Sequence, residues 1–256
     1  MKTVLILLTA LAFLMGARYG WAQTAPATPT HMQLFLLIGQ SNMAGRGTVD
    51  PNEQPDPHIF ALGKNKTWEP AKDPLHFDKP KMVGVGPGLS FARTVLKSDP
   101  SVTIGLIPAA MGGSSLDEWA PGGKLYKNAV DRARIAMHDG TLVGILWHQG
   151  EADSAADKVA TYGTRFTAMI ASLRKDLGAE KVPVIMGELG RFRPQDASVA
   201  FNAALPAVAA GVPLCGFVTT EGLTDRGDHL HFDTASAHTL GERYAAEYLK
   251  LKAAAK

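Results

Sequence analysis

The fold that this sequence predicts is decided by one stretch near the N-terminus, Phe35-Leu36-Leu37-Ile38-Gly39-Gln40-Ser41-Asn42-Met43-Ala44-Gly45. An apolar run ends abruptly there in a small polar turn, and this turn presents the hydroxyl group of Ser41. Apolar character without clean alternation is typical of a strand that is covered on both faces, as in a parallel sheet. We therefore expect Ser41 at the carboxyl end of a strand, where open parallel sheets bind their ligands.

Apolar runs of the same kind recur along the chain, and segments with helical periodicity separate them. The expected strands are 34–38, 102–107, 143–147, 182–186 and 214–219. The expected helices are 88–97, 124–138, 157–177, 197–209 and 234–251. Strands that alternate with helices predict a parallel sheet between two helical layers, and so an α/β protein with a five-stranded parallel sheet.

The segment from Gly45 to Gly86 differs from the rest of the chain because it contains six prolines and little periodicity. We expect this proline-rich segment to be a long surface excursion rather than a second domain, since long loops in compact domains tend to be functional or disordered. The whole chain has 256 residues, of which 46% are hydrophobic and 20% charged. This composition is typical of one globular domain.

The charge of the chain argues against two classes of partner, and its cysteine content excludes an internal disulfide. The net charge is +2, and no long block of like charges occurs, so the sequence indicates neither a nucleic acid nor an anionic membrane as partner. The single cysteine, Cys215, has no second cysteine with which to form an internal disulfide, and we expect it to be a small buried core residue.

The N-terminus has the features of a secretory signal peptide. Lys2 precedes an apolar run over residues 4–15, and the small residues of Gly20-Trp21-Ala22 form a cleavage signal. The alternative is a single-pass anchor, but the apolar run is short for a membrane span. We expect a signal peptide at 1–22, an N-terminal extension at 23–33 and the folded domain at 34–256. The mature protein would then be periplasmic or secreted, with no membrane contact after cleavage.

Polar residues follow four of the expected strands, in four separate segments. Besides the turn at Ser41, these segments are Met111-Gly112-Gly113-Ser114, Trp147-His148-Gln149-Gly150-Glu151 and Gly227-Asp228-His229-Leu230-His231-Phe232. The carboxyl ends of parallel strands meet at one edge of a sheet, so we expect these segments to converge there. Their convergence predicts an active site more strongly than any single motif does.

The predicted chemistry is nucleophilic catalysis by Ser41. A serine hydroxyl needs a base to remove its proton, and His231 is the candidate base. Asp228 lies three residues before His231, so one short loop can hold the carboxylate against the imidazole. Glu151 is the alternative acid for the same role. His229 and His231 have no further ligand at a spacing suited to a metal ion, and the sequence predicts neither a metal site nor a cofactor.

A tetrahedral intermediate also needs hydrogen-bond donors for its oxyanion. The expected donors are the backbone N–H of Ser41, that of Gly112 or Gly113, and the side-chain amide of Gln149. Candidate substrate contacts come from three other side chains. Asn42 either contacts the substrate or holds the nucleophile turn, Arg46 either contacts the substrate or is solvated, and Trp119 either stacks on a sugar or packs in the core.

These motifs resemble those of the SGNH/GDSL hydrolase superfamily, and most closely its branch with carbohydrate esterase family six and the sialate O-acetylesterase-like proteins. The resemblance extends from about Leu34 to the last helix. It implies a flavodoxin-like three-layer α/β/α sandwich and an acyl-enzyme mechanism without a metal. By position Ser41 matches the nucleophile, Asp228 and His231 match the Asp-x-x-His pair, and the glycine pair matches the oxyanion glycine. Gln149 stands where the wider superfamily has asparagine.

We therefore expect an exported serine esterase that removes O-acetyl groups from an acetylated carbohydrate such as xylan. Two other enzymatic alternatives are a sialate O-acetylesterase and a short-chain or aryl esterase. A non-enzymatic alternative is a carbohydrate-binding module on the same fold. Hydrolysis of a small acetyl ester separates an enzyme from a binding module. A comparison of acetate release from acetylated xylan and from O-acetylated sialic acid separates the two sugar substrates.

Overall fold

The computed structural model describes residues 29–193 and 198–254. The predicted signal peptide, 1–22, lies outside the described residues, as does most of the predicted extension, 23–33. The first strand, β1 (Met32–Gly39), begins two residues before the expected start of the domain. No helix among the described residues is long and apolar enough to cross a membrane.

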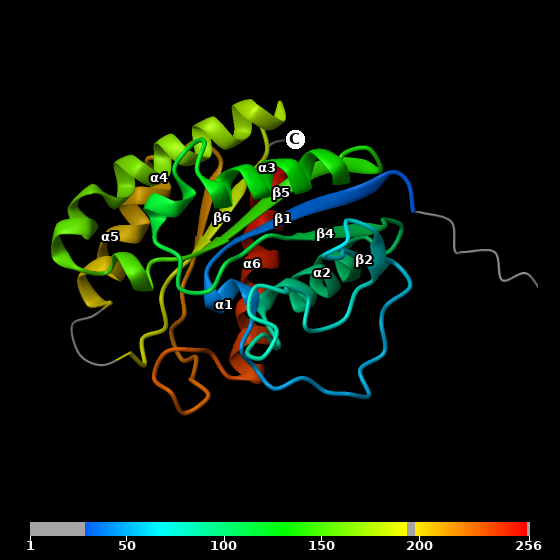
Figure 1. Cartoon of the computed structure of the whole chain (residues 1–256), viewed down its shortest axis with the longest axis horizontal. Helices are drawn as coiled ribbons and strands as arrows, with labels where there is room; N and C mark the ends of the chain where they lie inside the picture. The colour runs from blue at the N-terminus through cyan, green and yellow to red at the C-terminus, as the bar shows by residue number, and fades with distance from the viewer. Residues whose placement is uncertain (1–28, 194–197, 255–256) are drawn as a thin grey trace, which may run out of the picture.

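The described residues form one sheet of seven strands in the order β3-β2-β4-β1-β5-β6-β7. All neighbouring strands are parallel except β2 and β3, which are antiparallel at one edge. Figure 1 shows β1 and its neighbours at the centre of the molecule. The other strands are β2 (Ile59–Leu62), β3 (Trp68–Pro70), β4 (Ile104–Pro108), β5 (Gly140–His148), β6 (Val184–Gly187) and β7 (Cys215–Val218).

The prediction of five strands is wrong, because the proline-rich segment contributes β2 and β3 to the sheet. These strands have only four and three residues, and turn-forming residues flank them, so they show no measurable periodicity. Pro70 ends β3, which lies on the sheet edge where a missing N–H is tolerated. The rest of the predicted α/β class, a sheet between two helical layers, is confirmed.

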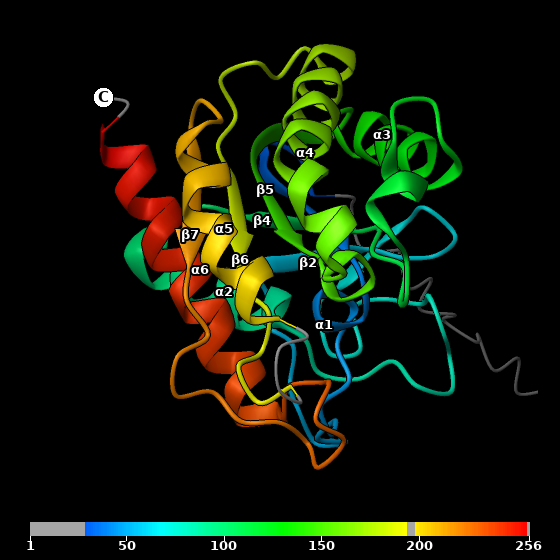
Figure 2. The ribbon, with the colours of Figure 1, turned by 90° about the vertical axis from the view of Figure 1, so that its left-hand side faces the viewer.

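Helices cover both faces of the sheet. Contacts between elements place α2 (Pro87–Ser98) and α6 (Thr234–Ala254) together on one face, and the two helices pack against each other. The second face is covered by α3 (Lys124–Ala136), α4 (Ala156–Leu177) and α5 (Val199–Ala210). Figures 1 and 2 show this three-layer arrangement from two directions.

Strand β1 shows why both faces need cover. Leu34, Leu36 and Ile38 belong to the apolar cluster under α3, α4 and α5, whereas Phe35 and Leu37 belong to the cluster under α2 and α6. Side chains along a strand alternate between the two faces, and here both sets are apolar.

Cys215 in β7 is only partly buried, in contrast to the expected core position.

The strand order places the end of β1 at the point where the chain changes direction across the sheet. From β1 the chain builds β2, β3 and β4 on one side, and it then crosses to β5 on the other side. Open α/β sheets bind ligands in the crevice at such a switch point. Ser41 begins the short helix α1 (Ser41–Ala44) directly after β1, so the fold places it in this crevice.

The close approach of β1 to β5 requires glycine at position 39. Gly39 has a φ of 128°, and a Cβ atom on it would lie 2.1 Å from the carbonyl oxygen of His148.

We predict that Gly39→Ala lowers the free energy of unfolding far more than Gly178→Ala, the matched control. Gly178 has a φ of 59° with no atom within 4 Å of its Cβ position, so alanine there costs only about 1–2 kcal/mol. Urea denaturation measures both, and equal losses would contradict the steric argument.

Candidate active site

The structure brings together three residues that the sequence predicts as a catalytic set. Ser41 Oγ lies 3.0 Å from His231 Nε2, and His231 Nδ1 lies 2.8 Å from Asp228 Oδ2. Ser41 follows the central strand β1, whereas Asp228 and His231 lie in the loop after β7. Residues separated by 190 positions in the sequence therefore meet at one edge of the sheet.

Asp228 fixes both the orientation and the protonation pattern of His231. Its Oδ1 accepts the backbone N–H groups of Leu230 and His231, at 3.0 and 2.8 Å. Burial alone would raise the pKa of Asp228, but the hydrogen bonds from His231 and Leu230 outweigh burial and hold this pKa below its usual range. A carboxylate on Nδ1 leaves the Nε2 lone pair of a neutral imidazole to accept the Ser41 hydroxyl proton.

Glu151, the alternative acid, takes a different partner. Its Oε1 accepts a hydrogen bond of 2.5 Å from Nδ2 of Asn42, and no hydrogen bond joins it to His231. Burial raises the pKa of Glu151. Of the two acids that the sequence leaves open, the structure pairs Asp228 with the histidine.

The glycine pair lies in a tight turn beside Ser41. The turn is closed by a hydrogen bond of 3.2 Å from Ser114 N–H to Met111 O, and Gly113 has a φ of 83°, as the third position of a type II turn requires. The N–H of Gly112 donates to Oδ2 of Asp78 at 2.8 Å. Among the described residues, by contrast, the N–H groups of Gly113 and Ser41 donate to no acceptor. Because Asp78 already accepts the Gly112 N–H, Gly113 is the more available oxyanion donor of the two.

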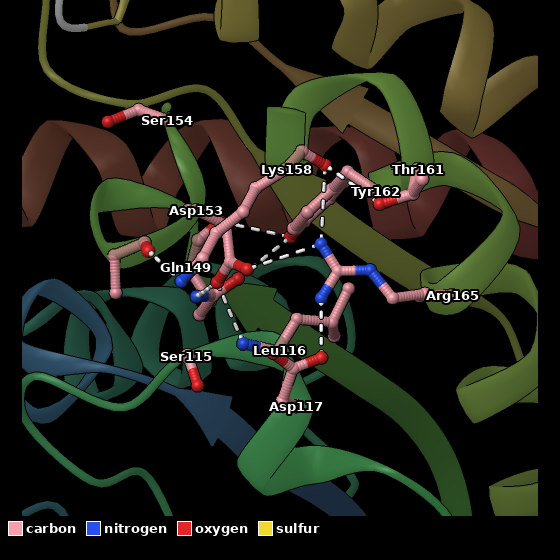
Figure 3. Close-up of polar contacts among 12 residues, drawn as sticks. Ser115, Leu116, Asp117, Gln149, Asp153, Ser154, Lys158, Thr161, Tyr162 and Arg165 are labelled. Atoms are coloured by element: carbon pink, nitrogen blue, oxygen red, sulfur yellow. Dashed lines mark hydrogen bonds and ion pairs between the residues drawn. The ribbon is translucent and has the colours of Figure 1, made fainter. Parts of the chain in front are cut away.

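The oxyanion role predicted for Gln149 does not fit the structure, as Figure 3 shows. Its Nε2 donates to Ser114 O at 3.1 Å and to Asp153 Oδ2 at 2.6 Å, which uses both amide hydrogens. Tyr162 accepts the indole N–H of Trp147, and its own hydroxyl lies 3.0 Å from Gln149 Oε1. These partners fix the orientation of the Gln149 amide and leave it no free N–H group. Gln149 therefore stabilises the site through internal hydrogen bonds instead.

Asp153 is the centre of this hydrogen-bond network, and the sequence did not indicate a role for it. It is fully buried, and besides Gln149 it accepts the Leu116 N–H at 2.7 Å and contacts Arg165 at 3.3 Å. Arg165 also binds Asp117 at 2.7 Å, so the network in Figure 3 ties the loop after β5 to the segment that follows the glycine turn. Only three-dimensional burial distinguishes Asp153 from an ordinary surface acid in this loop.

The three predicted substrate contacts are all buried side chains with protein partners. Trp119 is only 1% exposed, donates its indole N–H to Ser114 Oγ at 2.9 Å and packs edge-on against Trp147. Arg46 is likewise buried and binds Asp78 at 2.8 Å. Asn42 binds Glu151 and backbone groups beside His231. The substrate-contact predictions for Trp119, Arg46 and Asn42 are therefore corrected to internal roles.

Arg46 and Asp78 form a buried ion pair at the glycine turn. A Cβ atom on Gly112 would lie within 4 Å of the Arg46 guanidinium, the Asp78 carboxylate and Ser41 Cβ, so the pair is next to Ser41. Burial alone would raise the pKa of Asp78, but the hydrogen bond and charge of Arg46 outweigh it and hold this pKa below its ordinary value. Asp78 thus ties the proline-rich segment to the turn, a role that no sequence pattern indicates.

Removal of one member of this pair should be costly. We predict that Asp78→Ala lowers the free energy of unfolding by about 3–5 kcal/mol, because it leaves Arg46 as an uncompensated buried charge. The double variant Arg46→Met with Asp78→Ala removes both charges and should lose less stability than Asp78→Ala alone. Urea denaturation of the three proteins measures the difference. A double variant less stable than the single one would show that the buried Arg46 charge does not need Asp78 to be tolerated.

A family comparison identifies this arrangement. A model described as carbohydrate esterase, sialic acid-specific acetylesterase, matches residues 31–250, which is most of the chain. This chain belongs to that carbohydrate esterase family. It is 33% identical over 246 residues to a probable carbohydrate esterase of Arabidopsis thaliana, covering 85% of this chain and 90% of the relative.

Solved structures agree with the family at the level of the fold. A structure from Arabidopsis thaliana has a TM-score of 0.75 and 31% identity, covering 85% of this chain and 98% of that one. The structure of NanS has a TM-score of 0.76 at 19% identity, with coverage of 89% and 99%. A carbohydrate acetylesterase from Xanthomonas citri has a TM-score of 0.67 at 18% identity, with coverage of 87% and 57%. The esterase family and its α/β fold are thus established for this chain.

Proposed function

We propose that this esterase is a serine enzyme that removes O-acetyl groups from a carbohydrate through an acyl-enzyme. The observation that supports the mechanism is the continuous line of contacts from Ser41 Oγ through His231 to Asp228, at 3.0 and 2.8 Å. A hydroxyl, an imidazole and a carboxylate in this order constitute a nucleophile, its general base and the group that stabilises the imidazolium.

In the proposed reaction, Ser41 Oγ attacks the acetyl carbonyl carbon while its proton passes to His231 Nε2. The carbonyl oxygen becomes an oxyanion, and the N–H groups of Ser41 and Gly113 are the donors available to it. Collapse of this intermediate breaks the bond to the sugar oxygen, which takes the proton from His231. Water then attacks acetyl-Ser41, with His231 again as base, and releases acetate and free Ser41.

Space for a sugar lies beside this centre. A cavity of about 590 Å³ is bordered by Met111 of the glycine turn and by Asp78, and polar side chains of α3 such as Asn128 line it. Phe77 lines the same cavity, and a lining that combines an aromatic residue with polar side chains suits a pyranose ring. The cavity supports a carbohydrate leaving group and gives no preference between sugars.

We take acetylated xylan as the first substrate to test and O-acetylated sialic acid as the second. The family description favours the sialic acid, whereas a solved structure with the fold is an acetyl-xylooligosaccharide esterase, at 12% identity and a TM-score of 0.57. Acetate release from each, at matched acetyl concentration, decides between them. Activity confined to short-chain or aryl esters would reject both sugars. Sugar binding without acetate release would indicate a binding module.

We also propose that the protein is exported, on the strength of its N-terminal sequence alone. Lys2, the apolar run at 4–15 and Gly20-Trp21-Ala22 support a signal peptide. Expression of the full chain in a bacterial host, followed by N-terminal sequencing of the periplasmic protein, tests this proposal. A mature start at Gln23 is expected, whereas an uncleaved chain in the membrane fraction would favour an anchor.

The nucleophile is tested by Ser41→Ala. We predict that acetate release falls to background while the melting temperature stays close to that of the wild type, because the hydroxyl fills no apolar core. Acetate is measured by a coupled assay, and the melting temperature by circular dichroism. Substantial turnover by a folded Ser41→Ala protein would show that another group attacks the ester.

The acid is tested by Asp228→Asn beside Glu151→Gln, since both changes remove one charge at nearly constant size. We predict that Asp228→Asn lowers kcat by about 10³- to 10⁴-fold, because an amide disturbs the tautomer of His231 and leaves its imidazolium without a counter-charge. Glu151→Gln should lose far less, since Glu151 does not bind the imidazole. Steady-state kinetics that rank the two variants in the opposite order would assign the acid to Glu151.

A further inference from the structure

Asn42, the residue after the nucleophile, binds the backbone on both sides of the catalytic histidine. Its Nδ2 donates to the carbonyl oxygen of Leu230 at 3.1 Å, and its Oδ1 accepts the N–H of Phe232 at 3.2 Å. Leu230 and Phe232 are the two neighbours of His231 in the chain. One side chain beside Ser41 therefore holds the peptide groups that flank His231.

The loop that holds His231 needs such an anchor. Residues 226–229 are exposed, and His229 has a φ of 53°, which is a left-handed conformation that non-glycine residues rarely adopt. Asp225 and Asp228 bind backbone N–H groups within the loop, but these bonds do not join it to the nucleophile. The bonds from Asn42 do join it to the nucleophile turn, because Asn42 is buried in α1 next to Ser41.

Glu151 fixes which way the Asn42 amide faces. Its Oε1 accepts the Nδ2 of Asn42 at 2.5 Å, and its Oε2 is buried with no hydrogen-bond partner among the described residues. A carboxylate oxygen on one side of the amide selects the NH₂ group for that side and leaves Oδ1 for the Phe232 N–H. Glu151 thus acts on the histidine loop through Asn42 rather than on the imidazole itself.

We propose that Asn42, oriented by Glu151, is a positioning residue that sets the distance between Ser41 Oγ and His231 Nε2. This inference rests on the proposed function, because it assumes that Ser41 is activated by His231. Without the Asn42 bonds, the loop is still joined to the segment after Ser41 by Arg226, which donates to Arg46 O at 2.6 Å, but the peptide groups beside His231 lose their anchor and the imidazole can shift from the hydroxyl. Displacement of a reacting group by about 1 Å can cost about a hundredfold in rate.

The reactivity of Ser41 toward a small fluorophosphonate tests the inference without any carbohydrate. The expected result for Asn42→Ala is a labelling rate about a hundredfold below that of the wild type, measured well below the melting temperature. The matched control is Asn202→Ala, because Asn202 binds both backbone groups of Leu189 at 2.9 Å in the same manner but makes no hydrogen bond to His231 or to its neighbours in the chain. The control should lose stability and keep the labelling rate.

Each outcome decides the question. Equal labelling of folded wild type and Asn42→Ala overturns the inference and leaves the proposed function standing. A Ser41 that is not labelled in the wild type overturns the proposed function, and the inference with it. Slow labelling of both Asn42→Ala and Asn202→Ala would show a general loss of packing and would also overturn the inference.

A second pair of variants tests the role of Glu151 and serves if Asn42→Ala does not fold. Asn42→Asp keeps the acceptor for the Phe232 N–H but places a carboxylate against Glu151, so we expect slow labelling. Addition of Glu151→Gln restores a donor opposite Asp at position 42, so the double variant should be labelled faster than Asn42→Asp alone. A double variant no faster than the single one would overturn the coupling between Asn42 and Glu151.

Discussion

The hydrogen bond between Ser41 and His231 is the interaction on which the account of this esterase depends. It joins the end of β1, at the centre of the sheet, to a loop that follows β7 at the far edge. A bond of 3.0 Å between such distant segments exists only if the sheet, both helical layers and the loop are all in place. On the proposed mechanism, activity therefore depends on the whole fold, including parts far from the substrate.

Buried polar groups supply the precision that this bond requires. Three of them form hydrogen bonds that fix the three loops around Ser41. Asp78 binds the glycine turn, Asp153 binds Gln149, and Asn42 binds the loop that contains His231. A buried polar group costs free energy when it loses its hydrogen-bond partners, so each of these contacts favours one loop arrangement over others. The same property makes each contact sensitive to the loss of a single partner.

The sequence alone predicted the parts of the molecule that depend on local pattern. Apolar strands and amphipathic helices fix the layers, and the positions of Ser41, Asp228 and His231 after strand ends predict their meeting. The strands β2 and β3 escaped prediction because they are short and gain their pairing from neighbours rather than from their own periodicity.

The fate of individual polar side chains was harder to predict, because a donor's partner depends on what the fold places next to it. Gln149 has the chemistry of an oxyanion donor, yet Asp153 and Ser114 already use its hydrogens. Arg46 and Trp119 have the chemistry of sugar contacts, yet both are buried. Residue type defines what a side chain can bind, whereas packing decides what it does bind.

The most direct test of the central claim is detection of acetyl-Ser41. An activated aryl acetate has a good leaving group, so acylation outpaces deacylation and the acetyl-enzyme accumulates before an acid quench. Peptide mapping by mass spectrometry should then find one acetyl group on the peptide that contains Ser41, and none on that peptide from Ser41→Ala. Turnover of the ester with no acetyl on Ser41, or with the acetyl on another residue, would contradict the account.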